Sequence, residues 1–315
     1  MVDCTFGEVG TGLIQIKVKY MIKGVIFSVS ASLLFGVIYY LSTVLQPMSG
    51  EALLGWRILV TLPFLFVLLY LIKQHNVFLQ FIVQLKNQPY LLLVLLVTSA
   101  SMGVQMWLFL WAPVNNRAIE VSMGYLLMPL IMVLIGRFLY RERISKIKAY
   151  AILFATVGVL SKIILSGSFY WESILACLGY PLYFVIRRQF NILHFSSFVV
   201  EMILLLPISF YFANQVDMAW VQTQNSNIYL WLAVLGIVGA VALGVYVLAS
   251  QTLPMNLFGL LSYLEPVTMF TVSFLIGERL ANDSYLLMIC LFIAIILLVL
   301  DGSFRVWQKP KMNIL

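Results

Sequence analysis

Four ionisable side chains lie inside long apolar stretches of the chain, where they are the first candidates for chemistry. They are Arg57, Glu120, Glu201 and Glu265. A charged side chain in hydrocarbon costs at least about 2.5–3.5 kcal/mol on insertion scales, so it usually faces a cavity, a partner or a functional site. The carboxyl groups offer proton transfer, and the guanidinium offers binding of a carboxylate or phosphate.

Glu265 is the strongest candidate for proton coupling. It lies nine residues into the apolar segment 256–277, which corresponds to a depth of about 14 Å in a ~30 Å hydrocarbon layer. Pro266 follows it and removes a helical hydrogen bond, which opens the local backbone. The structural alternative is a protonated carboxyl group bonded to a neighbouring helix. Glu201 and Glu120 are the further proton-coupling candidates.

Arg57 and Glu201 are each about six residues, or ~9 Å, inside opposite faces of the membrane. That placement leaves about 12 Å between them across a ~30 Å layer, so a direct salt bridge is not expected. We expect Arg57 to face an outer vestibule and to bind an anionic group, with snorkelling or a pair with Glu120 as the alternatives. We expect Glu201 to line an inner vestibule, with a structural hydrogen bond as the alternative.

Aromatic and amide side chains within the apolar segments are the candidates for substrate contacts. Small-molecule sites combine apolar walls with a few polar groups, although Trp and Tyr are also enriched at membrane interfaces. The predicted substrate-binding residues are Tyr40, Arg57, Gln105, Trp111, Tyr125, Tyr183, Tyr246 and Tyr263.

Composition determines the kind of scaffold that positions these residues. Hydrophobic residues make up 63% of the 315 residues and charged residues only 10%, against about 45–50% and 25% in globular domains. The chain is therefore predicted to be an all-α polytopic membrane protein. Its net charge of +7 is scattered between apolar stretches, which indicates topology signals and lipid headgroups rather than nucleic acid. The three cysteines have no metal or redox spacing, so neither a metal nor a cofactor is expected.

Ten apolar segments have the length of about 20 residues that a membrane-spanning helix requires. With a cytoplasmic N-terminus, fourteen Lys and Arg residues fall on the inner side and three on the outer side. The positive-inside rule then places both termini in the cytoplasm. The predicted spans are 24–45, 52–72, 89–111, 118–139, 147–165, 171–187, 195–213, 228–250, 256–277 and 284–303.

The two halves of the chain repeat several residues at offsets of about 140 positions. The repeated sets are Tyr125, Pro129 and Glu142-Arg143 with Tyr263, Pro266 and Glu278-Arg279; Arg57 and Pro63 with Glu201 and Pro207; and Gly36 and Tyr40 with Gly179 and Tyr183. Five spans per half would insert the halves in opposite orientations, as in many secondary transporters. We predict an N-terminal extension at 1–20, which is either disordered or an artefact of start-site choice, five-helix repeats at 21–165 and 166–305, and a cytoplasmic tail at 306–315. Glu142 and Glu278 are expected to form structural ion pairs at helix ends.

Two five-helix halves, each with a proline-containing fourth span that closes on Glu-Arg, resemble the drug/metabolite transporter superfamily and its EamA repeat. The segment 115–129, together with Phe35-Gly36 and the sequence from Leu261 to Pro266, is similar to the RarD branch, named for chloramphenicol sensitivity. The resemblance covers residues 21–305. It implies a multi-pass permease of the bacterial inner (cytoplasmic) membrane that exports small metabolites.

The leading functional hypothesis is a secondary transporter that exports small metabolites or drugs by alternating access, with proton coupling as a further hypothesis. The sequence has no Walker-type loop, His-Glu-x-x-His motif or Gly-x-Ser-x-Gly elbow, so we predict that the chain is not an enzyme. A flippase for an amphipathic lipid is the alternative. The expected partners are a small-molecule substrate and membrane lipids, with no nucleic acid, in a monomer or homodimer.

Overall fold

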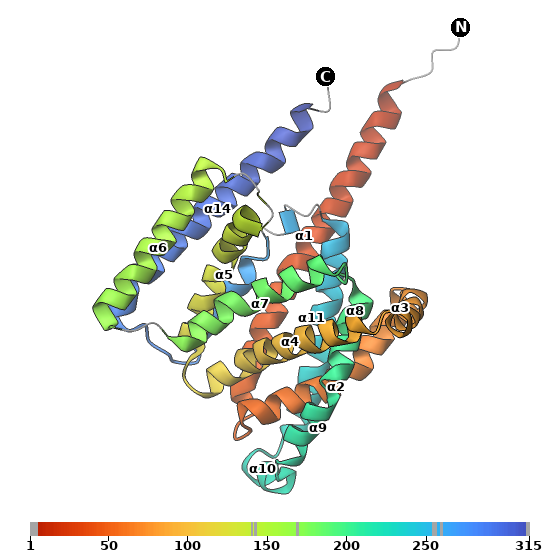
Figure 1. Ribbon diagram of the computed structural model, residues 1–315, viewed down its shortest axis with the longest axis vertical. Coiled ribbons are helices and arrows are strands. Elements are labelled where there is room, and N and C mark those ends of the chain that lie inside the picture. The colour runs from red at the N-terminus through yellow and green to blue at the C-terminus, as the bar shows by residue number, and fades with distance from the viewer. Residues whose placement is uncertain are drawn as a thin grey trace.

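The computed structural model describes residues 6–139, 141, 144–167, 170–253, 257–258 and 261–312, and this part of the chain is helical with no strand (Figure 1). The helices are α1 (Phe6–Val44), α2 (Gly50–Leu71), α3 (His75–Asn87), α4 (Tyr90–Val114), α5 (Ala118–Leu139), α6 (Lys146–Ser166), α7 (Trp171–Gln189), α8 (Phe195–Leu204), α9 (Leu206–Asn214), α10 (Met218–Gln224), α11 (Ile228–Thr252), α13 (Leu264–Leu275), the 3₁₀ turn η1 (Asn282–Ser284) and α14 (Tyr285–Met312).

Seven of these helices are long and apolar enough to cross a membrane, and an eighth span is formed if α8 and α9, which are bent by 42°, count as one. The polytopic all-α prediction is therefore confirmed in this coarser form. Two helices in predicted spans are not among these candidates. Helix α7 carries three charged residues, Glu172, Arg187 and Arg188, and α13 has only 12 residues. Glu142 and Arg143 lie outside the described residues, as do parts of the predicted span 256–277.

Local sequence explains where several helices begin and end. The side chains of Ser49 and Ser145 accept hydrogen bonds from Ala52 N and Lys148 N, which caps the first turns of α2 and α6. Gly167 ends α6 with a left-handed φ of 72°, a conformation that glycine adopts without strain. Helix α3 lies between two predicted spans and was not predicted. It is amphipathic and buries only Phe81 among its described side chains.

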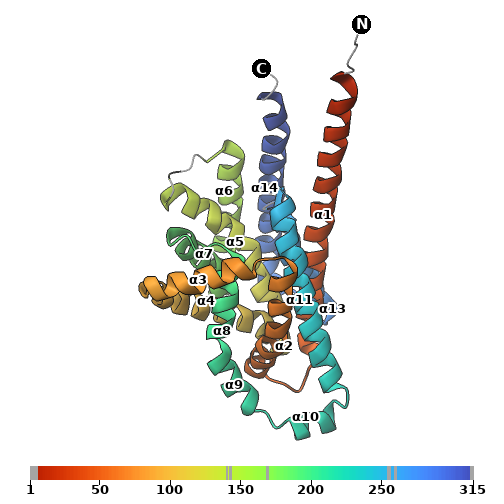
Figure 2. The ribbon, with the colours of Figure 1, turned by 90° about the vertical axis from the view of Figure 1, so that its right-hand side faces the viewer.

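The helices pack as a central group with a peripheral pair. α1 packs against α11 and α13, α5 against α7 and α13, and α2 against α4, α9 and α11. α6 packs along α14 to the side of this group (Figure 1). The first turn of α1 and the last turn of α14 lie at the same end of the molecule, opposite α10, in both views (Figure 2).

Two polar contacts join α6 to the segment that contains η1 and α14. Lys162, which is fully buried, forms an ion pair with Asp283 at 2.6 Å, and Ser145 donates to Asp301 at 2.5 Å. Because the contacts lie near opposite ends of α6, they fix its register along α14.

The largest buried cluster lies at the end where α1, α4 and α13 finish and α2, α5, α7 and α11 begin. Tyr39, which is fully buried there, donates to the carbonyl of Ala118 at 3.1 Å. The carboxylate of Glu278 accepts from the backbone N–H groups of Ala118 and Ile119 at 2.8 and 2.7 Å. This end of the bundle is therefore packed shut.

Candidate functional site

A cavity of about 310 Å³ lies between eight helices, α1, α2, α4, α5, α7, α8, α11 and α13. None of its described lining residues comes from α6 or α14. Its apolar wall consists of aromatic, methionine and aliphatic side chains. Its polar and charged residues are Arg57, Tyr125, Tyr180, Tyr183, Arg187, Tyr246, Ser250, Ser262 and Glu265. The helices of the central group thus enclose five of the predicted site residues.

Arg57 lies on α2 in the wall of this cavity, with only 7% of its surface exposed. Its guanidinium carbon lies 5.4 Å from the centre of the Phe109 ring. The Nη1 atom is buried and has no hydrogen-bond partner in the described part of the chain. A buried guanidinium nitrogen without an acceptor is costly, so this side chain is suited to receive an acceptor from a bound molecule.

Glu265 lines the same cavity from the first turn of α13 and is half-buried. It is not joined to Arg57 by an ion pair in the structure, although both side chains border one cavity. Arg57 and Glu265 are therefore ionisable groups of opposite type that can each contact a molecule bound in the cavity.

Tyrosine side chains form much of the remaining polar surface. Tyr125 is 4% exposed and donates to Gln105 Oε1 at 3.3 Å. Its ring lies 5.8 Å from the ring of Tyr180, centre to centre. Tyr246 packs edge-on against Phe35 with the ring centres 6.1 Å apart. These rings give the cavity a wall that is apolar on its faces and polar at the hydroxyl groups.

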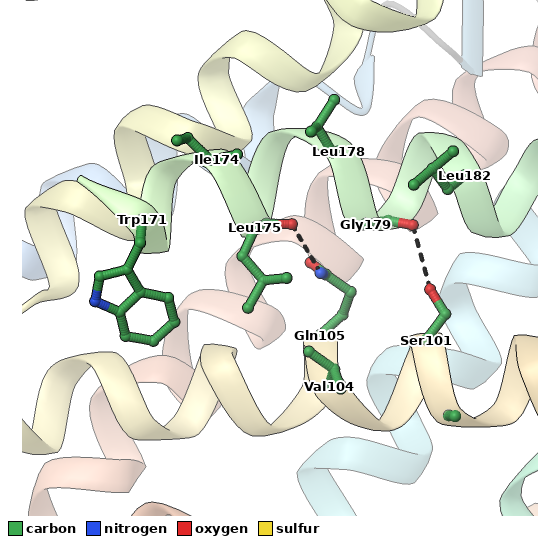
Figure 3. Close-up of a pocket in the computed structure, with 10 residues that line it drawn as sticks. Ser101, Val104, Gln105, Trp171, Ile174, Leu175, Leu178, Gly179 and Leu182 are labelled. Carbon is green, nitrogen blue, oxygen red and sulfur yellow. Dashed lines mark hydrogen bonds between the residues drawn. The ribbon is translucent and has the colours of Figure 1, made fainter. Parts of the chain in front are cut away.

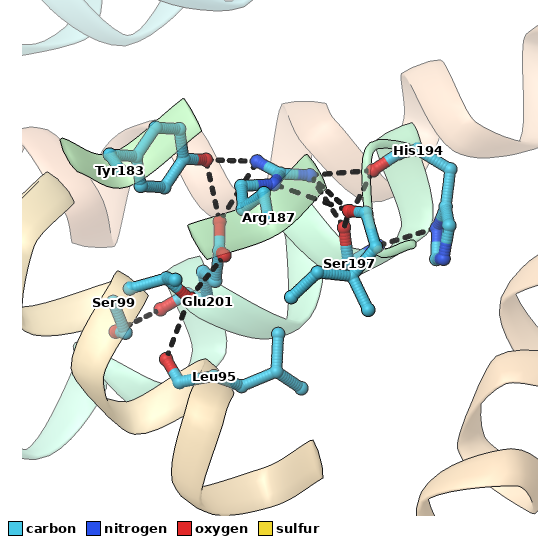
Figure 4. Close-up of polar contacts among 9 residues, drawn as sticks. Leu95, Ser99, Tyr183, Arg187, His194, Ser197 and Glu201 are labelled. Atoms are coloured by element: carbon cyan, nitrogen blue, oxygen red, sulfur yellow. Dashed lines mark hydrogen bonds and ion pairs between the residues drawn. The ribbon is translucent and has the colours of Figure 1, made fainter. Parts of the chain in front are cut away.

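Glu201 does not line the cavity, but it supports two residues that do (Figure 4). It is fully buried, and its carboxylate accepts from Thr98 at 2.6 Å and from Tyr183 at 2.8 Å. Arg187 Nη1 forms an ion pair with it at 3.2 Å. The same guanidinium donates to the carbonyl of His194 at 3.0 Å. The protein thus supplies the hydrogen-bond acceptors that the Arg187 guanidinium needs.

Arg187 lines the cavity but was not among the predicted site residues, since it was counted only among the fourteen basic residues of the inner side. The four-residue spacing of Tyr183 and Arg187, both on one helical face, was the available signal. The described ion pair of Glu201 is with Arg187 rather than with Arg57.

Several predicted site residues lie away from the cavity. Tyr40 is 46% exposed on α1, and Trp111 packs against Trp171 with ring centres 5.6 Å apart. Tyr263 packs against the separate hydrophobic cluster between α5, α6 and α14. Glu120 pairs with Arg117 at 3.4 Å, and no ion pair between Glu120 and Arg57 is present among the described residues.

Gln105 connects the cavity to a groove between α4 and α7 (Figure 3). Its side chain lines this groove of about 550 Å³, donates to Leu175 O at 3.0 Å and accepts from Tyr125. Gly179 permits this close approach, because a Cβ atom there would overlap Gln105 Nε2 at 1.8 Å. Leu178 and Leu182, on the outer wall, are 40% and 54% exposed. The groove is thus apolar and faces outward from the bundle.

Glu278 performs a structural task different from the one predicted. It was expected to form a helix-end ion pair, but its carboxylate caps the N-terminus of α5 through two backbone N–H groups. Burial raises the pKa of this carboxyl group, while the two backbone N–H groups act in the opposite direction. Among the described residues no group of three or more His, Cys, Asp or Glu could hold a metal ion.

Comparisons with known proteins agree with this architecture. The family model of the EamA-like transporter family matches residues 22–163. An uncharacterized transporter of Pasteurella multocida is 48% identical over 92% of this chain and 100% of that protein. The chloramphenicol-sensitive protein RarD of Pseudomonas aeruginosa is 34% identical over 93% of this chain and 98% of that protein. A solved crystal structure has a TM-score of 0.53 at 15% identity, over 89% of this chain and 98% of that chain, which indicates a shared fold.

Proposed function

This chain belongs to the EamA-like transporter family, in its RarD-type branch, and we propose from this premise that it is a secondary transporter whose substrate binds in the central cavity. The cavity is the observation that carries the proposal. It brings Arg57 and Glu265 together among tyrosine rings, and eight helices from both halves of the chain contribute to it. A volume of 310 Å³ lies at the lower end of the range of about 300–1,000 Å³ for ligand pockets, so the substrate is a small molecule.

We further propose ten spans arranged as two inverted five-helix repeats, with both termini in the cytoplasm of a bacterial cell and the protein in its inner membrane. The pairing of helices supports this arrangement. If α1 corresponds to α7 and α4 to α11, the α1–α11 contact has its counterpart in the α7–α4 contact. The α5–α7 contact similarly has its counterpart in the α13–α1 contact. Such an exchange of equivalent contacts is the basis of alternating access in inverted-repeat transporters.

The packed end of the bundle corresponds to the outer side in this topology. Tyr39, Ala118 and Glu278 close that end through hydrogen bonds between α1, α5 and the loop after α13. The described conformation is therefore assigned as closed to the outside. Opening requires that these contacts separate while the inner halves of the helices close.

Glu265 is the proposed site of proton coupling, and export of metabolites is the direction that the family resemblance implies. The test is transport by the purified protein in liposomes, in which a panel of small aromatic and amino-acid solutes is assayed with and without a pH gradient. Saturable transport supports the proposal. In Glu265→Gln, transport should persist without its response to the gradient, and Glu51→Gln, outside the cavity, serves as the control. Failure of the wild-type protein to move any of these solutes would count against a small-molecule transporter.

A lipid flippase is the second candidate function, and the groove between α4 and α7 is the observation that favours it. Its apolar outer wall would contact acyl chains, and Gln105 joins it to Tyr125 in the cavity. The discriminating assay is the movement of a fluorescent phospholipid between the leaflets of the same liposomes. Scrambling that is abolished by Gly179→Leu, which obstructs the groove, would favour this function over small-molecule transport.

A further inference from the structure

Among the described residues, none supplies a hydrogen-bond acceptor to Nη1 of Arg57, which lies in the cavity wall. Its side chain is 93% buried, as its 7% exposure implies, and its Nη1 atom has no hydrogen-bond partner in the described part of the chain. Arg187, the other guanidinium in the wall, already has the Glu201 carboxylate and two backbone carbonyls. The two arginines therefore differ: Arg187 is satisfied within the protein, and Arg57 has no anionic partner among the described residues.

We propose that the transported molecule carries a single carboxylate that binds Arg57, and that its apolar body packs against the aromatic wall of the cavity. This inference rests on the proposed function, because it names the substrate class of the same site. A guanidinium donates two parallel hydrogen bonds to a carboxylate. Phe109, beside Arg57, and Tyr125 also line the cavity and provide apolar contact for an aromatic or branched body.

The charge balance of the cavity favours a monoanion over a phosphate. Its charged lining groups are Arg57 on α2, Arg187 on α7 and Glu265 on α13, and its phenols are Tyr125, Tyr180, Tyr183 and Tyr246. Glu201 neutralises Arg187 from behind the wall. When Glu265 is protonated, one positive charge at Arg57 remains to balance the ligand, and a dianion would then leave an uncompensated charge in a site of low polarity.

Glu265 makes binding of this anion dependent on protonation. With an ionised Glu265, the pair of Arg57 and Glu265 is neutral, and an added carboxylate brings the net charge to −1. With a protonated Glu265, the added carboxylate brings the net charge to zero. Proton and anion therefore favour each other's binding and move in the same direction. An inward proton gradient then drives uptake, whereas export of the anion requires its own outward gradient.

The experiment is thermal unfolding of the purified full-length protein with benzoate, benzamide or benzylamine, with sodium chloride matched to the benzoate salt. These probes share a ring and differ in the charge of the head group. Benzoate is expected to stabilise the wild-type protein with an apparent affinity about tenfold above that of benzamide. Arg57→Gln should remove this preference and Arg57→Lys should retain part of it. The matched control Arg188→Gln, which removes an exposed charge one residue from the satisfied arginine, should leave it unchanged.

Glu265→Gln supplies a second test that keeps Arg57 intact. It imitates the protonated carboxyl group, so benzoate binding at pH 8 should strengthen about tenfold, and its dependence on pH should disappear. Glu51→Gln should leave both unchanged. Equal stabilisation by benzoate and benzamide, no stabilisation by benzoate, or a benzoate preference that survives Arg57→Gln would each overturn the inference. Saturable transport of a neutral or cationic solute in the liposome assay would leave the proposed transporter function standing while the anion assignment fails.

Discussion

At the scale of single residues, the structure separates charged groups that are satisfied from those that are available. Glu201 and Glu265 were both predicted as candidates for proton coupling, and their surroundings differ sharply. Glu201 is fully buried and holds Thr98, Tyr183 and Arg187, whereas Glu265 borders open space in the cavity. The structure therefore favours a supporting role for the first carboxylate and a ligand-facing role for the second.

Glu201→Ala should destabilise the protein, because it leaves the buried Arg187 guanidinium without its carboxylate. Removal of one partner of a buried ion pair costs about 3–5 kcal/mol, which unfolding in a series of denaturing detergent mixtures would detect. The double variant Arg187→Met, Glu201→Leu should recover most of this loss, because apolar replacement of a whole buried pair is often nearly neutral. A Glu201→Ala protein of normal stability that has lost proton-dependent transport would instead make Glu201 a coupling residue.

Tyr125→Phe tests the link between the cavity and the groove. It removes the hydrogen bond from the Tyr125 hydroxyl to Gln105 and should reduce the free energy of unfolding by about 0.5–1.5 kcal/mol. Tyr90→Phe, at an exposed hydroxyl on α4, is the matched control and should change little. An unchanged free energy of unfolding in Tyr125→Phe would show that the buried bond contributes nothing.

At the scale of elements, α8 begins on a titratable cap. His194 Nδ1 accepts from Ser197 N at 3.1 Å, which requires the neutral imidazole. Burial, and then the Arg187 guanidinium, lower the pKa of His194 below its ordinary value of 6.5. The folded protein binds this proton less well than the unfolded chain does. The contribution of the cap to the free energy of unfolding is therefore complete above pH 6.5 and is lost as the pH falls through the lowered pKa of His194.

Hydrogen exchange in the first turn of α8 should therefore accelerate on acidification, relative to the intrinsic exchange rate at each pH. The His194→Asn variant keeps a capping acceptor that does not titrate, so protection in this turn should stay constant between pH 7.5 and about 5. Identical behaviour of the two proteins would contradict a role of His194 as the cap.

The number of spans is the element-scale prediction that matters most for the repeat. Alkaline phosphatase fused after Gln224, in α10, should be active because the ten-span topology places this loop outside. Fusion after Gln189 should be inactive, because the end of α7 is then inside. Activity at both positions would show that the segment between them does not cross the membrane as predicted, and the two five-span halves would be lost.

The sequence predicted the helical elements better than the contacts between them. Apolar segments of spanning length located nearly every long helix, because the cost of unsatisfied backbone groups in lipid forces such segments into helices. The position of each residue within its predicted span also identified Arg57 and Glu265 as site candidates. It could not show that Trp111 and Tyr263 lie elsewhere, because the rotation of a helix about its axis depends on its neighbours. Nor could spacing reveal the capping role of Glu278, whose partners Ala118 and Ile119 lie about 160 positions earlier.

At the scale of the whole molecule, the helices divide into a group that encloses the cavity and a pair that does not. α6 and α14 supply no lining residue in the described part of the chain, and they are tied by the contacts of Lys162 with Asp283 and of Ser145 with Asp301. We therefore expect the conformational exchange to involve the eight cavity helices, with α6 and α14 moving as one body.

The measurement that tests the central claim most directly needs no knowledge of the substrate. Met128→Cys, in the cavity wall, would be made in a protein whose Cys4, Cys177 and Cys290 are replaced by serine, and labelled with a membrane-impermeant thiol reagent in right-side-out and inside-out vesicles. Alternating access predicts that this single position reacts from both sides, while Leu291→Cys, which is fully buried on α14, reacts from neither. Reaction of Met128→Cys from one side alone, under every condition, would contradict a transport site in the central cavity.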